Sequence, residues 1–158
     1  MEENYITILI QSLEKKIKVL EEVSRENANQ KQILREDDMD MDAFQASIDK
    51  KDRLIEQVGF LDDGFEKMYE RVKQVLNEKS DVYAEQIAHL KQLIMSVTDW
   101  TASIQKEEWD NRRLAEQQFS SMKKKVRQMK DSKQVATKYY QSMAKLNYVD
   151  PQFMDKKK

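Results

Sequence analysis

Apolar residues recur at helical spacing over almost the whole chain. Near the N-terminus they follow one another at steps of three or four residues, which places them on one face of a helix: Ile6, Ile10, Leu13, Ile17 and Leu20. The stripe thins through SRENANQKQ (residues 24–32) and returns at Ile33 and Leu34. The pattern therefore predicts a first helix that ends before the acidic stretch REDDMD.

A second helix is predicted to begin near Asp42, after a turn over residues 36–41. Asp42 and Gln45 have the spacing of a capping box. In a capping box the first side chain accepts a hydrogen bond from a free backbone N–H group, and the second side chain reaches back to the N–H group of the first residue. Two adjacent apolar stripes then run as far as Leu76. So wide an apolar face suits a helix that packs against more than one neighbour.

The stretch NEKSD (residues 77–81) predicts a second turn, with Ser80 as the N-cap of a third helix. The apolar stripe of this helix starts at Tyr83, slips around residues 107–111 and resumes at Ala115. No proline precedes Pro151, so the pattern predicts one long helix. The alternative is a break near Asp110 followed by a short fourth helix that folds back.

These elements predict an all-α fold: an antiparallel bundle of three long helices with an extended C-terminal helix. Residues 1–114 are expected to form the bundle, and residues 115–158 an amphipathic helix and tail that extend the same domain and bind a partner. The expected centre of the bundle is Leu13, Ile17, Leu54, Val58, Leu61, Phe65, Leu90, Ile94 and Val97.

The apolar stripe after residue 114 is expected to have no helix within the chain to bury it, which indicates a docking surface. Its predicted partner-binding residues are Phe119, Met122, Val126, Met129, Tyr140 and Met143. Methionine suits such a surface because its flexible, polarisable side chain adapts to partners of different shape. Beyond Leu146 the chain is expected to leave the helix, because Pro151 disfavours helical geometry at the residue before it. Tyr148 and Phe153 are then predicted as short-motif anchors.

Composition and charge narrow the functional class. Charged residues make up 36% of the chain, and there is no cysteine to form a disulfide or ligate a metal. The acidic start MEENY does not fit a secretory signal, and no apolar run approaches the ~18 residues that membrane insertion requires. These features predict a cytoplasmic protein.

The charge is unevenly distributed. Residues 123–158 hold eleven Lys/Arg against three Asp, a net charge of +8, so the net charge of −1 leaves −9 on residues 1–122. Such asymmetry hints at an acidic partner. The run KKKVRQMK has no nucleic-acid-binding motif beside it, and we interpret it as a solvated helix face. Nucleic acid is therefore not expected as a partner.

Candidate chemistry is sparse, and no catalytic residue, metal site or cofactor is predicted. His89 is the only histidine and has no nucleophile arrangement that would make a triad. Asp38, Asp40 and Asp42 alternate as at the start of a calcium loop, but alanine stands at the sixth position and aspartate at the twelfth, where glycine and glutamate are needed. The sequence therefore does not predict an enzyme.

Three further residues interrupt the pattern. Gly59 and Gly64 lie inside the second helix, where each costs about 1 kcal/mol relative to alanine. We interpret them as sites where another helix approaches closely, with a hinge as the alternative. Trp109 stands among polar residues and is predicted to be a partly exposed packing residue or a partner anchor.

The stretch IDKKDRLIEQVGFLDDGFEKMYERVKQVL (residues 48–76) resembles the FlgN-type flagellar export chaperones. The pattern K-x-x-L-I falls on Lys51, Leu54 and Ile55, and the pattern L-D-x-G-F-E-x-x-Y-x-R-V on residues 61–72. The ending, in which Phe153 precedes MDKK, is also similar to chains of this family.

The resemblance implies a cytosolic helical bundle that binds hook-filament junction proteins before export. It implies further that the C-terminal helix engages the terminal helices of the cargo and helps it dock at the flagellar type III export gate. The residues themselves leave two other classes open. One is a self-associating coiled coil, in which the third helix forms a homodimer with its own copy. The other is an adaptor with a basic tail on nucleic acid or membrane.

Overall fold

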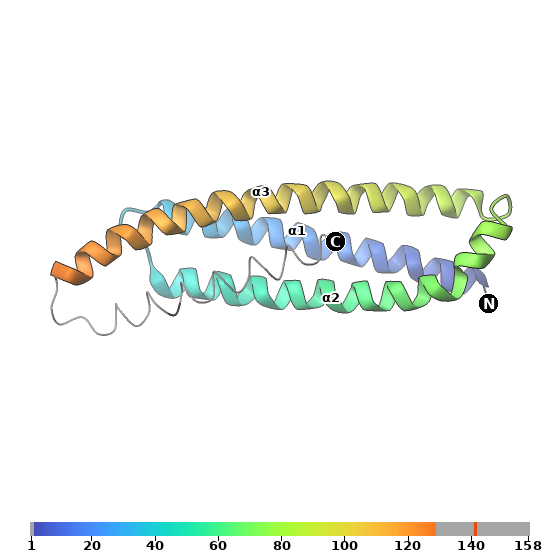
Figure 1. The fold of residues 1–158 in the computed structure, drawn as a ribbon, viewed down its shortest axis with the longest axis horizontal. Helices are drawn as coiled ribbons and strands as arrows, with labels where there is room; N and C mark the ends of the chain where they lie inside the picture. The colour runs from blue at the N-terminus through green and yellow to red at the C-terminus, as the bar shows by residue number, and fades with distance from the viewer. Residues whose placement is uncertain (1, 129–140, 142–158) are drawn as a thin grey trace. The chain divides into compact units, whose positions relative to one another are not determined.

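A computed structural model describes residues 2–128 and residue 141. The described chain is all-α and consists of helices α1 (Glu2–Arg35), α2 (Met41–Glu78) and α3 (Ala84–Gln128), which Figure 1 labels. The described residues form no strand. Proline is absent from these helices, and their only glycines are two residues of α2, which accounts for their length. The prediction of an all-α helical bundle is confirmed.

The connection between α1 and α2 comprises residues 36–40, close to the predicted turn. Asp40, and not Asp42, is the N-cap of α2. Its Oδ1 atom accepts hydrogen bonds from the backbone N–H groups of Asp42 (3.0 Å) and Ala43 (3.1 Å). The prediction of a capping box at Asp42 was therefore wrong, because Asp40 occupies the non-helical position directly before the first helical residue. Asp42 lies in the first turn, where a negative charge is favourable.

The N-cap assignment predicts the outcome of two matched substitutions. Asp40→Ala is expected to lower the free energy of unfolding by about 1 kcal/mol, because two backbone N–H groups lose their acceptor. Asp42→Ala removes a first-turn charge and is expected to cost less, about 0.3–1 kcal/mol at low salt. Urea unfolding followed by circular dichroism measures both changes. If Asp42→Ala lowers the free energy of unfolding more than Asp40→Ala does, Asp42 is the N-cap, as expected from the sequence.

The connection between α2 and α3 comprises residues 79–83, so the chain turns after Glu78 as predicted. The carbonyl of Tyr83 accepts the N–H of Ile87 at 2.9 Å, and α3 begins directly after Tyr83. The N-cap position is therefore Tyr83, and the prediction of Ser80 was wrong. The alternative break near Asp110 does not occur, because α3 is one helix through Gln128.

The chain divides into two compact units, and each contains a part of all three helices. Unit 1 comprises Met1–Glu22 and Leu54–Ala102, and unit 2 comprises Val23–Arg53 and Ser103–Lys158. The buried cluster of unit 1 is apolar apart from one tyrosine hydroxyl: Ile6, Leu9, Leu13, Val72, Leu76, Tyr83 and Leu90.

In unit 1 the start of α1 lies beside the α2–α3 connection, as Figure 1 shows. A carboxylate oxygen of Glu2 accepts from the ammonium of Lys79 and from the hydroxyl of Tyr83, each at 3.3 Å. Burial raises the pKa of the Tyr83 hydroxyl, and the negative charge of Glu2 raises it further. The first turn of α1 is therefore tied to the chain that leads into α3.

The expected centre of the bundle is partly correct. Four of its residues are buried, namely Leu13, Leu54, Val58 and Leu90, and four are half-buried, namely Ile17, Leu61, Phe65 and Val97. Ile94 is 48% exposed, so the prediction that it belongs to the centre was wrong. On α3 it is Leu93 and Val97 that pack against the cluster around Leu90, and Ile94 is rotated away from it.

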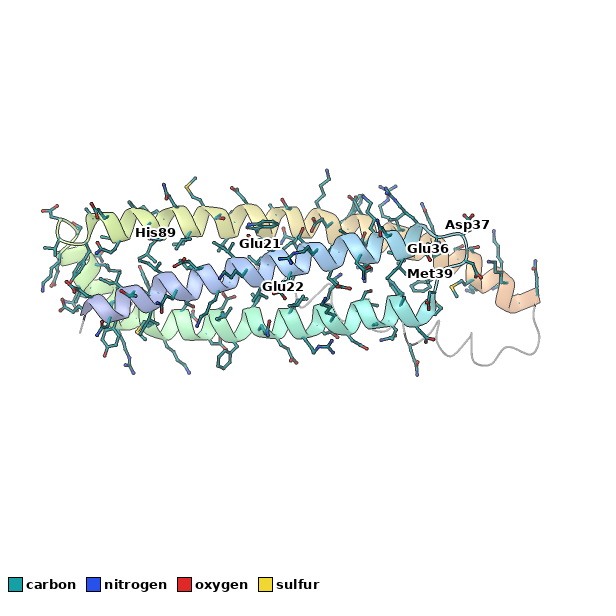
Figure 2. All side chains as sticks on the ribbon, turned by 180° about the vertical axis from the view of Figure 1, so that it is seen from behind. Glu21, Glu22, Glu36, Asp37, Met39 and His89 are labelled. Carbon is teal, nitrogen blue, oxygen red and sulfur yellow. The ribbon has the colours of Figure 1, made fainter. Side chains whose placement is uncertain are left out.

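The core of unit 2 includes Ala115 and Phe119, which are both buried. The ring of Phe119 packs edge-on against Phe44, with 5.6 Å between centroids and an interplanar angle of 71°. Met39, which Figure 2 labels in the α1–α2 connection, is also buried. The expectation that the stripe after residue 114 has no helix to bury it was therefore wrong at Ala115 and Phe119, because both are buried and Phe44 of α2 packs against Phe119.

Gln118 provides a polar contact in the same stretch of unit 2. Its Nε2 atom donates to the carbonyls of Leu34 (2.7 Å) and Glu36 (2.8 Å). The last carbonyls of a helix have no partner within the helix, so this amide satisfies groups at the end of α1. The beginning of the stretch that was predicted to bind a partner thus contributes to the folded unit.

Candidate functional site

The eight predicted partner-binding residues are described to different extents. Phe119 is only 1% exposed, so the prediction that it is accessible to a partner was wrong. Met122 is half-buried, and Val126 lies in α3 without a described side chain. The remaining five lie outside the described residues: Met129, Tyr140, Met143, Tyr148 and Phe153. The structure therefore removes Phe119 from the candidate surface, and the role of the others stays a prediction.

Unit 2 contains a buried polar network that the sequence analysis missed. At its centre is Lys51 of α2, which is 1% exposed. Its ammonium group donates to Glu108 Oε2 at 2.7 Å and to Gln30 Oε1 at 3.2 Å. A buried charge is tolerated when it is paired and hydrogen-bonded. The ammonium of Lys51 is paired with the carboxylate of Glu108 and also hydrogen-bonded to the amide oxygen of Gln30.

The network extends on both sides of Gln30. Gln30 Nε2 donates to the hydroxyl of Ser47 at 3.1 Å. Asn111 Nδ2 donates to Gln30 Oε1 at 3.2 Å and to the carbonyl of Asn27 at 2.9 Å. Nearby, Glu107 accepts from Ser24 (2.7 Å) and from Asn27 (3.3 Å). Because these donors and acceptors come from α1, α2 and α3, the network fixes which faces of the three helices meet within unit 2.

The sequence contained a signal for this network. The apolar stripe of the first helix thins through residues 24–32, and that of the third helix slips around residues 107–111. Both interruptions supply residues of the network. Apart from the family pattern, nothing in the sequence distinguishes Lys51, since a lysine in a charged helix gives no sign of burial.

The unit 1 parts of α1 and α2 form an apolar groove, which we call the α1–α2 groove. It is lined by Ile8, Leu9, Gln11, Ser12, Lys15, Phe60, Leu61, Gly64, Phe65 and Met68. Phe60 is 81% exposed, although a large apolar side chain gains by leaving water. An exposed apolar patch of this kind is typical of a binding surface.

The groove is bounded by contacts that hold α1 and α2 together in unit 1. The ammonium of Lys16 pairs with Asp62 at 2.6 Å, and the hydroxyl of Ser12 donates to the carbonyl of Leu61 at 3.4 Å. Phe65 stacks on Tyr69 with 6.1 Å between centroids and 7° between the ring planes. Of the two aromatic rings that line the groove, that of Phe65 therefore has a ring neighbour within α2.

Gly64 lies on the groove and has open space beside it. A Cβ atom built at Gly64 meets no described atom within 4 Å, its own helix backbone and chain neighbours aside. The interpretation that this glycine allows another helix of the chain to approach closely was therefore wrong. Phe60, Gly64 and Met68 are spaced by four residues and share one face of α2, so the glycine forms a notch between two large side chains.

Other candidate sites are weaker. Trp109 in unit 2 is exposed, as predicted, and the Arg113 guanidinium lies 5.0 Å from the centre of its ring. Its role as a partner anchor stays a prediction. His89, labelled in Figure 2, is an exposed residue of α3.

Within residues 2–128 and 141, no cluster of three or more His, Cys, Asp or Glu side chains is arranged to hold a metal ion. Over the same residues, no helix is both long and apolar enough to cross a membrane.

The fold and its surface define a class: a three-helix protein whose most exposed apolar side chain, among the described residues, lines a groove between helices. Such a surface is suited to binding another protein. A model of the FlgN protein family matches residues 1–147, so the chain belongs to the FlgN family and is a FlgN-type flagellar export chaperone. No curated protein and no solved structure matches the chain.

Proposed function

We propose that this chaperone acts in the cytoplasm, binds the terminal helices of hook-filament junction proteins and delivers them to the flagellar type III export gate. The observation that carries the proposal is the FlgN family match over residues 1–147. A match of that extent includes all three described helices and most of the basic C-terminal segment.

We place the cargo-binding residues from Met122 onward. Phe119 is the last fully buried apolar residue of the described part of α3, and Met122, one turn later, is only half-buried. The proposed contact residues are Met122, Val126, Met129, Tyr140 and Met143, with Tyr148 and Phe153 as anchors for the cargo or the export gate. An amphipathic segment of this kind supplies an apolar face for partner helices.

The lysines of the segment support an acidic partner. Lys123 and Lys124 are exposed on the last turns of α3, and further lysines follow at positions 130 and 138. Positive charge beside an apolar stripe keeps it soluble and steers acidic segments toward it.

The test is calorimetric titration of the full chain with a purified hook-filament junction protein from the same organism. The double substitution Tyr140→Ser and Met143→Ser is expected to weaken binding by about tenfold or more, because it removes two apolar contacts. Met95→Ser is the matched control, because Met95 is an exposed methionine of unit 1. It is expected to leave the dissociation constant unchanged.

Two outcomes would contradict the proposal in different ways. If the double variant binds like the wild type, the C-terminal segment is not the binding site. If the wild type does not bind the junction protein, the cargo class is wrong. Light scattering on the same samples separates the proposal from a self-associating coiled coil, for which a dimer is expected without cargo.

A further inference from the structure

We propose that the α1–α2 groove of unit 1 is a second cargo site, which takes one amphipathic helix with an aspartate or glutamate beside its apolar stripe. The inference rests on the proposed function, because it assigns the helix to the same cargo. It adds a contact surface at least 54 positions away along the chain from the C-terminal residues proposed above.

The groove leaves apolar surface uncovered. Phe60 of α2 and Ile8 of α1 are exposed, and Phe65 and Met68 of α2 are half-buried. A partner helix that covers these side chains buries their apolar surface. This burial is the main source of binding free energy for a helix bound in a groove. The walls belong to two packed helices, so the groove exists before a partner arrives.

Gly64 leaves a notch on the groove side of α2. Glycine in a helix interior is unfavourable, yet no described part of this chain occupies the space where a side chain would stand. A glycine flanked by Phe60 and Met68 at four-residue spacing allows the backbone of an external helix to approach α2 closely. A partner helix packed closely against α2 therefore accounts for a glycine at this position.

The charge at the groove also restricts the occupant. Lys15 is the only charged residue among those that line the groove. It is exposed and forms no ion pair within the described part of the chain, whereas the neighbouring Lys16 is paired with Asp62. An unpaired ammonium at the edge of an apolar groove favours a carboxylate in the occupant.

The same charge argues against two other occupants. A symmetric contact with a second copy would present the same surface from both sides, so Lys15 would face a groove that is itself lined by Lys15. Residues 129–158 of this chain hold seven lysines and three aspartates, so they carry the wrong sign of charge for that site. An external helix with a carboxylate fits better than either.

The test uses the full chain and the purified hook-filament junction protein. Gly64→Leu fills the notch, and Lys15→Glu reverses the charge; each is expected to weaken binding by about tenfold. The matched controls are Met95→Ser and Lys91→Glu, which change exposed residues of unit 1 outside the groove. Both controls are expected to bind within about twofold of the wild type.

Folding is monitored for every variant. Gly64→Leu replaces a poor helix former by a good one at an open position, so its midpoint of thermal unfolding is expected to be equal to or higher than that of the wild type. Weaker binding by this variant then cannot result from a damaged fold.

Charge exchange identifies the partner residue. Acidic residues of the cargo's terminal helices are changed one at a time to lysine, and each variant is titrated against Lys15→Glu. One of these exchanges is expected to restore about tenfold of affinity, because it rebuilds the ion pair with the opposite polarity.

The outcomes for the inference and for the proposed function are distinct. If Gly64→Leu and Lys15→Glu bind like the wild type while the Tyr140/Met143 variant does not, the groove is not a cargo site and the proposed function stands. If the wild type itself does not bind the junction protein, both fail. If Lys91→Glu weakens binding as much as Lys15→Glu, the effect is general electrostatics, and the groove assignment is overturned.

Discussion

Glu108→Leu is expected to lower the free energy of unfolding by about 3–5 kcal/mol, among the largest effects of any single substitution in this chain. The change leaves the ammonium of Lys51 buried without the carboxylate that it contacts at 2.7 Å. An unpaired charge in a protein interior costs far more than the net contribution of the pair. Guanidinium unfolding followed by circular dichroism measures the loss.

The double variant tests the cause of that loss. Lys51→Met combined with Glu108→Leu removes both charges and is expected to recover most of the stability that Glu108→Leu loses, because similar apolar volumes replace the pair. A surface pair serves as the control: Lys73 contacts Glu70 at 2.8 Å, and both side chains are exposed. Glu70→Leu is expected to have a much smaller effect. If the double variant is no more stable than Glu108→Leu, the loss does not come from an uncompensated lysine.

Phe119→Ala is the second substitution with a large expected effect, a loss of about 3–5 kcal/mol of unfolding free energy. The ring is fully buried in unit 2 and packs on Phe44, so its removal leaves a cavity and eliminates an aromatic contact. The same denaturation experiment measures it.

Phe60→Ala is the matched control, since it removes the same side chain from a site that is 81% exposed. It is expected to change stability by no more than about 0.5 kcal/mol. If Phe119→Ala leaves stability intact but weakens cargo binding, Phe119 belongs to a docking surface after all. Because Ala115 and Phe119 are core residues, a truncation meant to remove the proposed cargo-binding residues from Met122 onward has to leave Phe119 in place.

The helices and their connections were largely predictable, for local reasons. Hydrophobic periodicity reports helical structure, and both connections lie within a few residues of their predicted positions. The N-caps were less predictable. Asp38, Asp40 and Asp42 all carry a suitable acceptor, and which of them caps α2 depends on where the backbone enters the helix.

The binding surfaces were less predictable still. Periodicity identifies the apolar face of a helix but says nothing of what covers it. Ile94 was expected at the centre of the bundle and is exposed, whereas Phe119 was expected to be uncovered and is buried. The stripe after residue 114 is partly covered because Phe44, at the start of α2, packs against Phe119 within unit 2.

The sequence by itself determined that the chain is helical, where it turns, and that two apolar stripes are interrupted by polar residues. Only the tertiary structure decided that these interruptions meet around a buried lysine. Lys51 contacts Gln30 and Glu108, which are 21 and 57 positions away along the chain. A polar residue in an apolar stripe is compatible with a surface, a turn or a buried partner. The choice among these depends on packing between helices, which local sequence patterns do not encode.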